Sequence, residues 1–367
     1  MDYQYFIEYY KEFPFLIKLV WVVSLVMISI IIVLTIYLKI VRAFLRKKKI
    51  ETEKLKISYE TLLVEYLYAG EGDDNLISEP QKNIIEKLKK DVLVASKRKI
   101  IISILDNLMN EISGEMSESI KILYCKTGLM DYAMLKLKNK NWYVIAKGIT
   151  ELTRFKIEKS HHEISKFIKH PRVEVRKETQ LYLVNMFKFE GLSFLNNLTT
   201  PLSEWQQVQL LEVLNKFEDQ QICDIKPWLK SNNDTVVLFA LKLAQIYNQF
   251  EVKDALMDLL PHENKNIRIR TIEVLTDLYG IEAKDRLKAN FNGLSLEEQI
   301  SFFEFLEKLV VPSDEPFVEK HLFHKDFEIQ LLALKILKSI NIDKYMGLQD
   351  LPTHKKTPAM LKLVNAV

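Results

Sequence analysis

Histidine is the residue type whose chemistry most readily serves catalysis or metal binding, and this 367-residue sequence has seven. Three of them, His170, His262 and His324, each stand nine residues before the same position of a recurring helix pattern, which predicts a role in a turn. The densest groups are His161-His162-Glu163 and the pair His321 and His324. Neither has the spacing of HExxH or of a Cys/His zinc site. We therefore predict no metal ligands and no catalytic histidine.

Cysteines and paired carboxylates are the next candidates for chemistry. Cys125 and Cys223 are too few for a disulfide framework or a Cys-based zinc site, and both fall in predicted helices as small buried hydrophobes. Reduced cysteines suit a cytosolic body. Asp73-Asp74 lies in a linker and Glu297-Glu298 in the first turn of a helix, where solvation and the helix dipole account for them.

Motifs that would define an enzyme are missing from the sequence. It contains no G-x-S-x-G, P-loop, dinucleotide-binding fingerprint or kinase signature, and Gly70-x-Gly72 lacks the third glycine of a phosphate cradle. We predict a protein without a catalytic residue or cofactor. Fold and function separate freely, so missing motifs alone do not exclude an enzyme.

One segment has the length and composition of a membrane span. Leu19 to Leu38 is twenty residues without a charge, glycine or proline, and such a helix spans about 30 Å, the thickness of a hydrocarbon core. A cleaved signal peptide is less favoured, because the stretch is long and its positive charges follow it. The span has no GxxxG, no ionisable residue and only Ser24 and Ser29 as small polar residues, so we predict an anchor rather than a pore.

The charges around the span predict its orientation. The first thirteen residues carry Asp2, Glu8 and Glu12 against Lys11. The positive-inside rule places the amino terminus outside and residues 39–367 in the cytoplasm, as a single-pass protein of the cytoplasmic membrane. A stop-transfer anchor is the ordinary interpretation of the basic cluster, and an anionic-lipid site is the alternative. The cluster consists of Lys39, Arg42, Arg46, Lys47, Lys48 and Lys49.

Net charge bears on nucleic-acid binding. Residues 1–49 hold eight basic and three acidic residues, a net charge of +5. Because the whole chain carries +3, residues 50–367 carry −2. A faintly acidic body has no general attraction for phosphate backbones. We expect no nucleic-acid partner.

A repeat dominates the second half of the chain. Glycine (9) and proline (10) are scarce, which favours long helices. Seven segments each lead into a helix with one small or apolar residue at an equivalent place, at spacings of 33, 31, 30, 31, 31 and 31 residues. Stacked helix pairs would bury these positions in a continuous core. The equivalent residues are Ala146, Thr179, Leu210, Ala240, Thr271, Phe302 and Ala333.

Neighbouring positions extend each of these helices into an apolar stripe. Trp142, Val175, Val236, Ile267 and Ile329 stand four residues before five of the equivalent positions. Leu183, Leu214, Leu275, Leu306 and Leu337 stand four residues after five of them. Ser203 with Gln206, and Ser295 with Glu298, predict capping boxes at two of the helices.

Two of these segments carry a resemblance to a known family. VEVRKET (173–179) and NIRIRTIEVL (266–275) resemble the VR-x-x-A helix of short HEAT repeats. The resemblance covers about residues 139–342; Val175-Arg176 is the one full Val-Arg pair, and the segments at 202 and 294 depart from the pattern. It implies an α-solenoid of HEAT-like helix pairs with one long binding surface. Together with the apolar stretch at 19–38, the predicted fold is all-α, an α-solenoid preceded by one transmembrane helix.

These patterns divide the chain into seven predicted parts. They are a short extracytoplasmic amino terminus (1–15), a transmembrane helix (16–41), a basic juxtamembrane helix (42–69), a linker (70–78), a helical cap or degenerate repeats (79–138), about seven HEAT-like repeats (139–345) and a tail (346–367). The boundary between anchor and solenoid is placed at the linker, because its glycines and acidic residues break the helical pattern.

The resemblance implies a membrane-anchored scaffold or adaptor that binds a protein partner. A membrane enzyme complex such as a glycosyltransferase system is one partner that HEAT-like proteins suggest. Two enzymatic alternatives stay open: a DNA-glycosylase-like enzyme, which would need a basic groove, and a chromophore-lyase-like enzyme, which would need a cleft with acid or base residues. The sequence leaves the partner, the process and the oligomeric state open.

Overall fold

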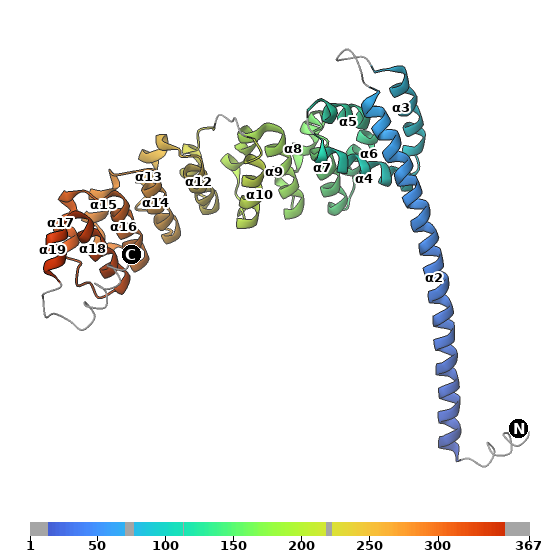
Figure 1. The fold of residues 1–367 in the computed structure, drawn as a ribbon, viewed down its shortest axis with the longest axis horizontal. Helices are drawn as coiled ribbons and strands as arrows, with labels where there is room; N and C mark the ends of the chain where they lie inside the picture. The colour runs from blue at the N-terminus through green and yellow to red at the C-terminus, as the bar shows by residue number, and fades with distance from the viewer. Residues whose placement is uncertain (1–13, 70–76, 113, 218–221, 349–367) are drawn as a thin grey trace, which may run out of the picture. The chain divides into compact units, whose positions relative to one another are not determined.

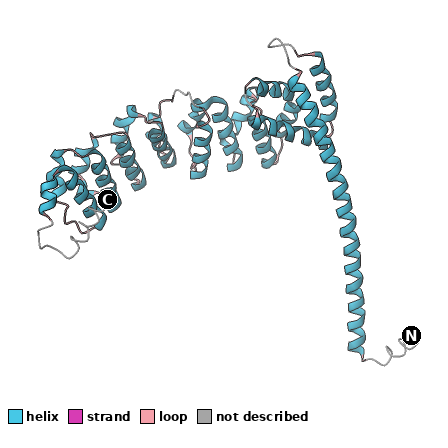
Figure 2. Cartoon of the chain, viewed as in Figure 1, coloured by secondary structure: helices cyan, strands magenta, loops and turns pink. Residues whose placement is uncertain are grey.

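The computed structural model describes residues 14–69, 77–112, 114–217 and 222–348. Within them it has eighteen α-helices and six 3₁₀ helices and no strand (Figure 2). The predicted all-α class is therefore confirmed for these residues. The predicted amino terminus up to residue 13, most of the linker and the tail beyond residue 348 lie outside the described residues.

The chain forms two compact units. The first comprises residues 1–140 and 150–160, and the second residues 141–149 and 161–367. The first unit contains five complete α-helices, α2 to α6, which are labelled in Figure 1. Their bounds are α2 Phe15–Tyr68, α3 Glu79–Val92, α4 Ala95–Glu111, α5 Glu115–Lys126 and α6 Leu129–Leu137, followed after α7 by η1 Glu158–Ser160. Helix α7, Trp142–Arg154, is divided between the two units.

The second unit alternates longer helices with short ones. The longer helices are α9 Val173–Phe187, α10 Glu204–Leu214, α12 Asp234–Ile246, α14 Lys265–Asp277, α16 Leu296–Leu309 and α18 Phe327–Ile340. Around them lie α8 His161–Ser165, η2 Lys166–Lys169, η3 Lys188–Asn197, α11 Lys226–Leu229, η4 Phe250–Val252, α13 Lys253–Leu259, α15 Ala283–Ala289, η5 Phe291–Gly293, η6 Pro312–Asp314, α17 Glu315–Glu319 and α19 Ile342–Gly347. Each longer helix contains one of the equivalent positions of the repeat pattern, from Thr179 in α9 to Ala333 in α18.

Longer helices of the second unit pack on their neighbours in chain order, in a solenoid-like way, in two series that divide between α10 and α12. Helix α9 contacts α10, α12 contacts α14, α14 contacts α16, and α16 contacts α18. One hydrophobic cluster extends from Val184 to Tyr345 without interruption. A helix pair of this size cannot bury its apolar faces alone, so the neighbours supply the rest of each other's core.

The equivalent positions of the repeat pattern supply much of this core. Thr179, Leu210, Ala240, Thr271, Phe302 and Ala333 are each at most 1% exposed.

The first predicted segment differs from the others. In α7, Ala146 is half-buried and Trp142 is 36% exposed, whereas Ile145 and Ile149 are buried. The buried stripe of α7 is therefore rotated by one residue from the predicted one. The physical reason is that Ile145, Ile149 and Leu152 follow the i, i+4, i+7 spacing with larger apolar side chains, and these occupy the core.

Candidate functional site

The basic cluster lies on a helix that is able to cross a membrane. Helix α2 is 54 residues long, and its most apolar 18-residue window, near the amino terminus, is 0% buried. By length and composition it is the one such helix among the described residues. All six basic residues of the cluster, Lys39, Arg42, Arg46, Lys47, Lys48 and Lys49, are exposed and follow the apolar stretch in the same helix.

The other end of α2 is built into the first unit. Tyr59, Leu63 and Tyr66 are at most 3% exposed and pack where α2 contacts α3, α4 and α5. The Gln81 Nε2 donates a hydrogen bond to the Tyr66 carbonyl at 3.0 Å. Burial and the hydrogen bond with Asp91 raise the pKa of Tyr59. The juxtamembrane helix is therefore a core element of this unit, although the sequence pattern places the boundary after it.

Three histidines close equivalent turns in the second unit. The Nδ1 of His170 accepts the Arg172 N–H at 3.1 Å, that of His262 accepts the Asn264 N–H at 3.0 Å, and that of His324 accepts the Asp326 N–H at 3.2 Å. An Nδ1 that accepts must be unprotonated, so Nε2 carries the proton in the neutral ring. This repeated turn accounts for the repeated histidine, as the sequence pattern predicts.

Two further histidines, His161 and His321, pack against aromatic rings. His161 stacks against Tyr182 and lies edge-on to Phe187. The Nδ1 of His321 lies 2.8 Å from the Phe317 carbonyl, and its ring contacts three phenylalanines. Burial lowers the pKa of His321, so the neutral imidazole is favoured there. Among the described residues no group of three or more His, Cys, Asp or Glu side chains could hold a metal ion.

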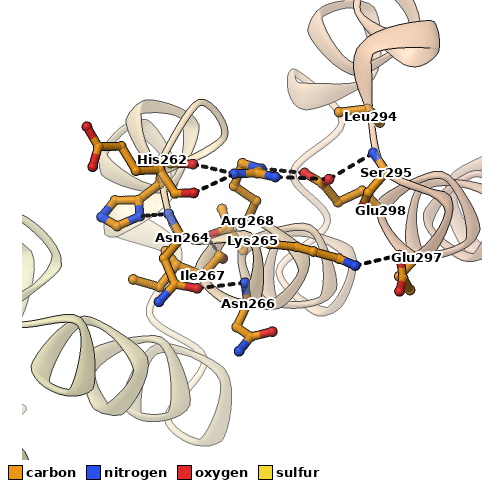
Figure 3. Close-up of polar contacts among 12 residues, drawn as sticks. His262, Asn264, Lys265, Asn266, Ile267, Arg268, Leu294, Ser295, Glu297 and Glu298 are labelled. Atoms are coloured by element: carbon orange, nitrogen blue, oxygen red, sulfur yellow. Dashed lines mark hydrogen bonds and ion pairs between the residues drawn. The ribbon is translucent and has the colours of Figure 1, made fainter.

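An arginine clamp connects one repeat turn to the next (Figure 3). Arg268 Nη1 donates to the carbonyls of His262 and Glu263 at 2.7 and 2.9 Å. Its Nε and Nη2 donate to the Glu298 carboxylate at 2.5 and 3.1 Å. Glu298 is 1% exposed; burial acts to raise its pKa, but bonds from Arg268 and Ser295 outweigh this and hold it below its usual range.

In α9 an arginine makes the same two bonds to turn carbonyls but pairs with no carboxylate among the described residues. Arg176 Nη1 donates to the carbonyls of His170 and Pro171 at 2.7 and 2.9 Å. In the part of the chain that the structure describes, no ion pair reaches Arg176. Arg176 and Arg268 each stand three residues before a buried threonine, Thr179 or Thr271, whose hydroxyl donates to the carbonyl four residues earlier. The arginine of the Val-Arg pattern therefore has a structural task.

The two predicted helix caps differ in detail. At Ser203, the hydroxyl accepts the Gln206 N–H at 3.3 Å and the Gln206 Oε1 accepts the Ser203 N–H at 3.0 Å, which is a complete capping box. At Ser295, the Glu298 carboxylate accepts the Ser295 N–H at 2.9 Å. That carboxylate also receives Arg268, so at Ser295 the cap and the clamp share one side chain.

Ser203→Ala tests the first cap. It should lower the free energy of unfolding by about 1 kcal/mol, because a first-turn N–H loses its acceptor, whereas Ser203→Gly should cost only a few tenths. Hydrogen exchange of the first-turn amides of α10 measures the change. Equal effects of alanine and glycine would contradict the capping role.

A polar hollow of about 680 Å³ lies between the end of η3 and the turn after α11. Asn196 accepts the Trp228 Nε1–H at 2.7 Å, and Asn233 donates to the Leu198 and Thr200 carbonyls at 2.9 and 3.0 Å. These hydrogen bonds connect the end of η3 to the residues around α11 and so fix the two sides of the hollow. The exposed residues at the rim are Asn196, Asn197, Thr199, Pro227, Lys230 and Asn232. Amide and hydroxyl groups of this kind can hydrogen-bond a peptide or another polar ligand.

The sequence did not single out this hollow. Its asparagines come from two different repeat turns, and their clustering depends on how neighbouring helices stack. The signal that could have found them is the density of asparagine in both turns, Asn196-Asn197 and Asn232-Asn233, about one repeat apart.

The two cysteines are half-buried. Burial raises the pKa of the Cys125 thiol and raises that of Cys223 to about 11. Because the thiolate is the nucleophile and metal ligand, thiols in such surroundings react slowly near neutral pH.

Acidic and basic side chains alternate around Glu304 on the longer helices of the second unit, where Glu273 pairs with Arg270 and Glu307 with Lys335. Burial, then the nearby carboxylates of Glu328, Glu273 and Glu307, raise the pKa of Glu304. These four residues come from α14, α16 and α18.

Comparisons with known proteins give no family. No protein-family model matches the sequence, and no curated protein matches it. Among solved structures, human deoxyhypusine hydroxylase in complex with glycerol is similar, with 11% identity, coverage of 80% of this chain and 100% of that chain, and a TM-score of 0.29. A likeness at this TM-score supports no statement about the fold or function of this chain.

Proposed function

We propose that this chain is a single-pass protein of the cytoplasmic membrane whose HEAT-like α-solenoid serves as a binding scaffold for a protein partner. The observation that carries the proposal is the continuity of α2. One helix contains an unburied apolar stretch, then a basic segment, and then Tyr59, Leu63 and Tyr66 in the core of the first unit. A folded body attached this directly to an apolar helix is suited to work at a membrane surface.

The solenoid interpretation is supported by polar contacts that recur at the repeat distance. Arg268 bonds Glu298 thirty residues away, Lys284 bonds Asp314 thirty away, and Trp228 bonds Asn196 thirty-two away. Contacts of this regular span arise when each helix pair packs on the next. An array of stacked pairs offers a long surface to a partner, and the asparagine-lined hollow lies on it.

A scaffold is favoured over an enzyme by the chemistry of these residues. Three repeated histidines serve turns, and the thiols have raised pKa values. The charges around Glu304 are mixed, because Glu273 pairs with Arg270 and Glu307 with Lys335, so this region has no excess of cations for a DNA-glycosylase-like groove. A membrane enzyme complex, such as a glycosyltransferase system, is the class of partner that we propose.

Capture of the partner tests the proposal. The full chain should be purified from membranes in mild detergent beside a shortened chain that begins at residue 50, because one that begins at residue 70 would lack Tyr59, Leu63 and Tyr66 of the core. Capture of one protein in near-equal amounts with both chains is the expected result. Recovery of no stoichiometric protein with either chain would contradict the scaffold.

Reversing the basic cluster tests the orientation. Changing Arg42, Arg46 and Lys47–Lys49 to Glu should move a large fraction of the molecules to the opposite orientation, since positive charge next to a span determines which end stays in the cytoplasm. Protease protection in sealed vesicles is the measurement. Lys82→Glu with Lys89→Glu is the control, because these residues lie far from the span. An unchanged protection pattern in the reversed cluster would count against the orientation.

A further inference from the structure

Helix α2 has a second apolar face outside the apolar span. Ile50, Ile57 and Val64 are 57%, 61% and 44% exposed. They stand seven residues apart, about two helical turns, so they share one side of the helix. Tyr59 and Tyr66 follow Ile57 and Val64 by two residues, a rotation of about 200°, and lie in the core of the first unit. The exposed apolar face, called here the outer stripe, is thus opposite to the packed one.

The seven-residue spacing of the outer stripe continues through the apolar half of the helix. All of its members are exposed in α2, which Figure 1 draws as one uninterrupted helix. Residues seven apart drift by only about 20° around an α-helix, so the stripe stays on one side of α2 over this length. The members are Val22, Ser29, Ile36, Ala43, Ile50, Ile57 and Val64.

Charges beside the outer stripe are arranged to complement a second copy. Lys47 and Lys54 stand three residues before Ile50 and Ile57 and lie along one edge of the stripe. Glu53 and Glu60 stand three residues after these isoleucines, along the other edge.

A parallel twofold pair places the lysine edge of each helix against the glutamate edge of the other. The Glu60 carboxylate already lies 3.7 Å from the Lys56 ammonium in the same helix. Such an exposed pair is weak, so the carboxylate can also pair with a lysine of the second copy.

We propose that the outer stripe binds a second copy of this chain, as a parallel helix pair whose seam is formed by Ile50, Ile57 and Val64 in residues 50–68 of α2, called here the stalk. The proposal rests on the membrane span of the proposed function, because a shared orientation in the membrane makes the two helices parallel and in register. Water outside the membrane gives Ile50, Ile57 and Val64 a reason to pair that lipid-facing residues lack.

Cysteine cross-linking of the full chain in native membranes tests the geometry. Ile50→Cys, Ile57→Cys and Val64→Cys should each form a disulfide-linked dimer on mild oxidation, at least fivefold more than Thr52→Cys or Ser58→Cys. The two control positions are exposed in the same helix but on other sides of it. The unaltered chain gives the background from Cys125 and Cys223. Equal cross-linking at all five positions would indicate random collision and overturn the proposal.

A charge in the seam tests the same interface without oxidation. Ile57→Glu should shift the full chain in nanodiscs or mild detergent from dimer to monomer by at least tenfold in dissociation constant, measured by mass photometry. Ser58→Glu adds the same charge beside the seam and should leave the dimer intact. Both side chains are exposed, so neither change threatens folding. A monomer in the unaltered chain would overturn the proposal.

Alkaline extraction of the same membranes separates this inference from the proposed function. A chain that stays in the membrane but shows no position-dependent cross-link retains its anchor and loses the dimer. Extraction of the chain would contradict the membrane anchor, and with it the parallel dimer that depends on the anchor. A cross-linked product whose mass fits this chain plus a different protein would assign the stripe to that protein and overturn the homodimer.

Discussion

Asp314→Leu is expected to destabilise the second unit by about 3–5 kcal/mol, the cost of leaving a buried charge without its partner. Asp314 and Lys284 are 1% and 5% exposed, and their side chains meet at 2.8 Å. Lys284 also donates to the Leu309 carbonyl at 2.8 Å, and Lys288 and the Val311 N–H donate to the same carboxylate as Lys284. Removing the carboxylate therefore strands a buried ammonium and an amide.

Hydrogen-exchange protection of α15, η6 and α17 measures this loss. Adding Lys284→Met to Asp314→Leu should recover part of the stability, because the uncompensated charge is then gone. Glu79→Gln, which breaks the exposed pair of Glu79 and Lys82, should have no measurable effect. A loss at Asp314 no larger than that of the control would contradict the burial argument.

Acid should weaken the same cluster of Asp314, Lys284 and Lys288, because the Asp314 carboxylate is then protonated. Burial acts to raise the pKa of Asp314, but hydrogen bonds from Lys284, Lys288 and Val311 outweigh this and hold it below its usual range. A carboxyl whose pKa is lowered by folding stabilises the fold above its unfolded value of about 3.9 and loses that contribution as the pH falls through the folded value. Asp314→Leu should remove this part of the acid dependence.

Arg268→Leu is the second change expected to have a large effect, also about 3–5 kcal/mol, because it leaves the Glu298 carboxylate buried and unpaired. The chain contains its own control. Arg176→Leu removes the same pair of bonds to two turn carbonyls but strands no carboxylate, so about 1–3 kcal/mol is expected.

The difference between the two arginine variants measures the cost of the stranded carboxylate. Urea unfolding of the chain that begins at residue 50, with hydrogen exchange to locate the change, is a suitable measurement. Glu298→Gln combined with Arg268→Leu should recover part of the loss. Equal losses for Arg176→Leu and Arg268→Leu would show that the bond between repeats contributes little.

Periodicity in the sequence was sufficient to predict most helices. An apolar residue every three or four positions requires a helix with one buried side, and the regular spacing from Thr179 to Ala333 indicates that neighbours bury it. It failed in α7 because two stripes compete there. Trp142 and Ala146 suit the repeat register, but Ile145 and Ile149 offer more apolar surface to the core.

Features that depend on the packing of distant residues could not be predicted from local pattern. Lys284 and Asp314 look like ordinary surface charges in the sequence, and only the stacking of their helices removes both from water. The stalk of α2 was predicted as a helix but not as part of the first unit. Tyr59, Leu63 and Tyr66 were visible as an apolar stripe, but the glycines after Ala69 indicated a boundary that the packing does not respect.

If α2 spans the membrane as proposed, its unbroken course also determines the distance between the bilayer and the first unit. From Leu38, at the end of the apolar stretch, to Tyr59, the first buried residue of the stalk, the helix rises about 30 Å at roughly 1.5 Å per residue. A partner enclosed within the lipid would be out of reach. In the proposed function, a membrane partner that binds the first unit would therefore need a soluble domain of comparable height.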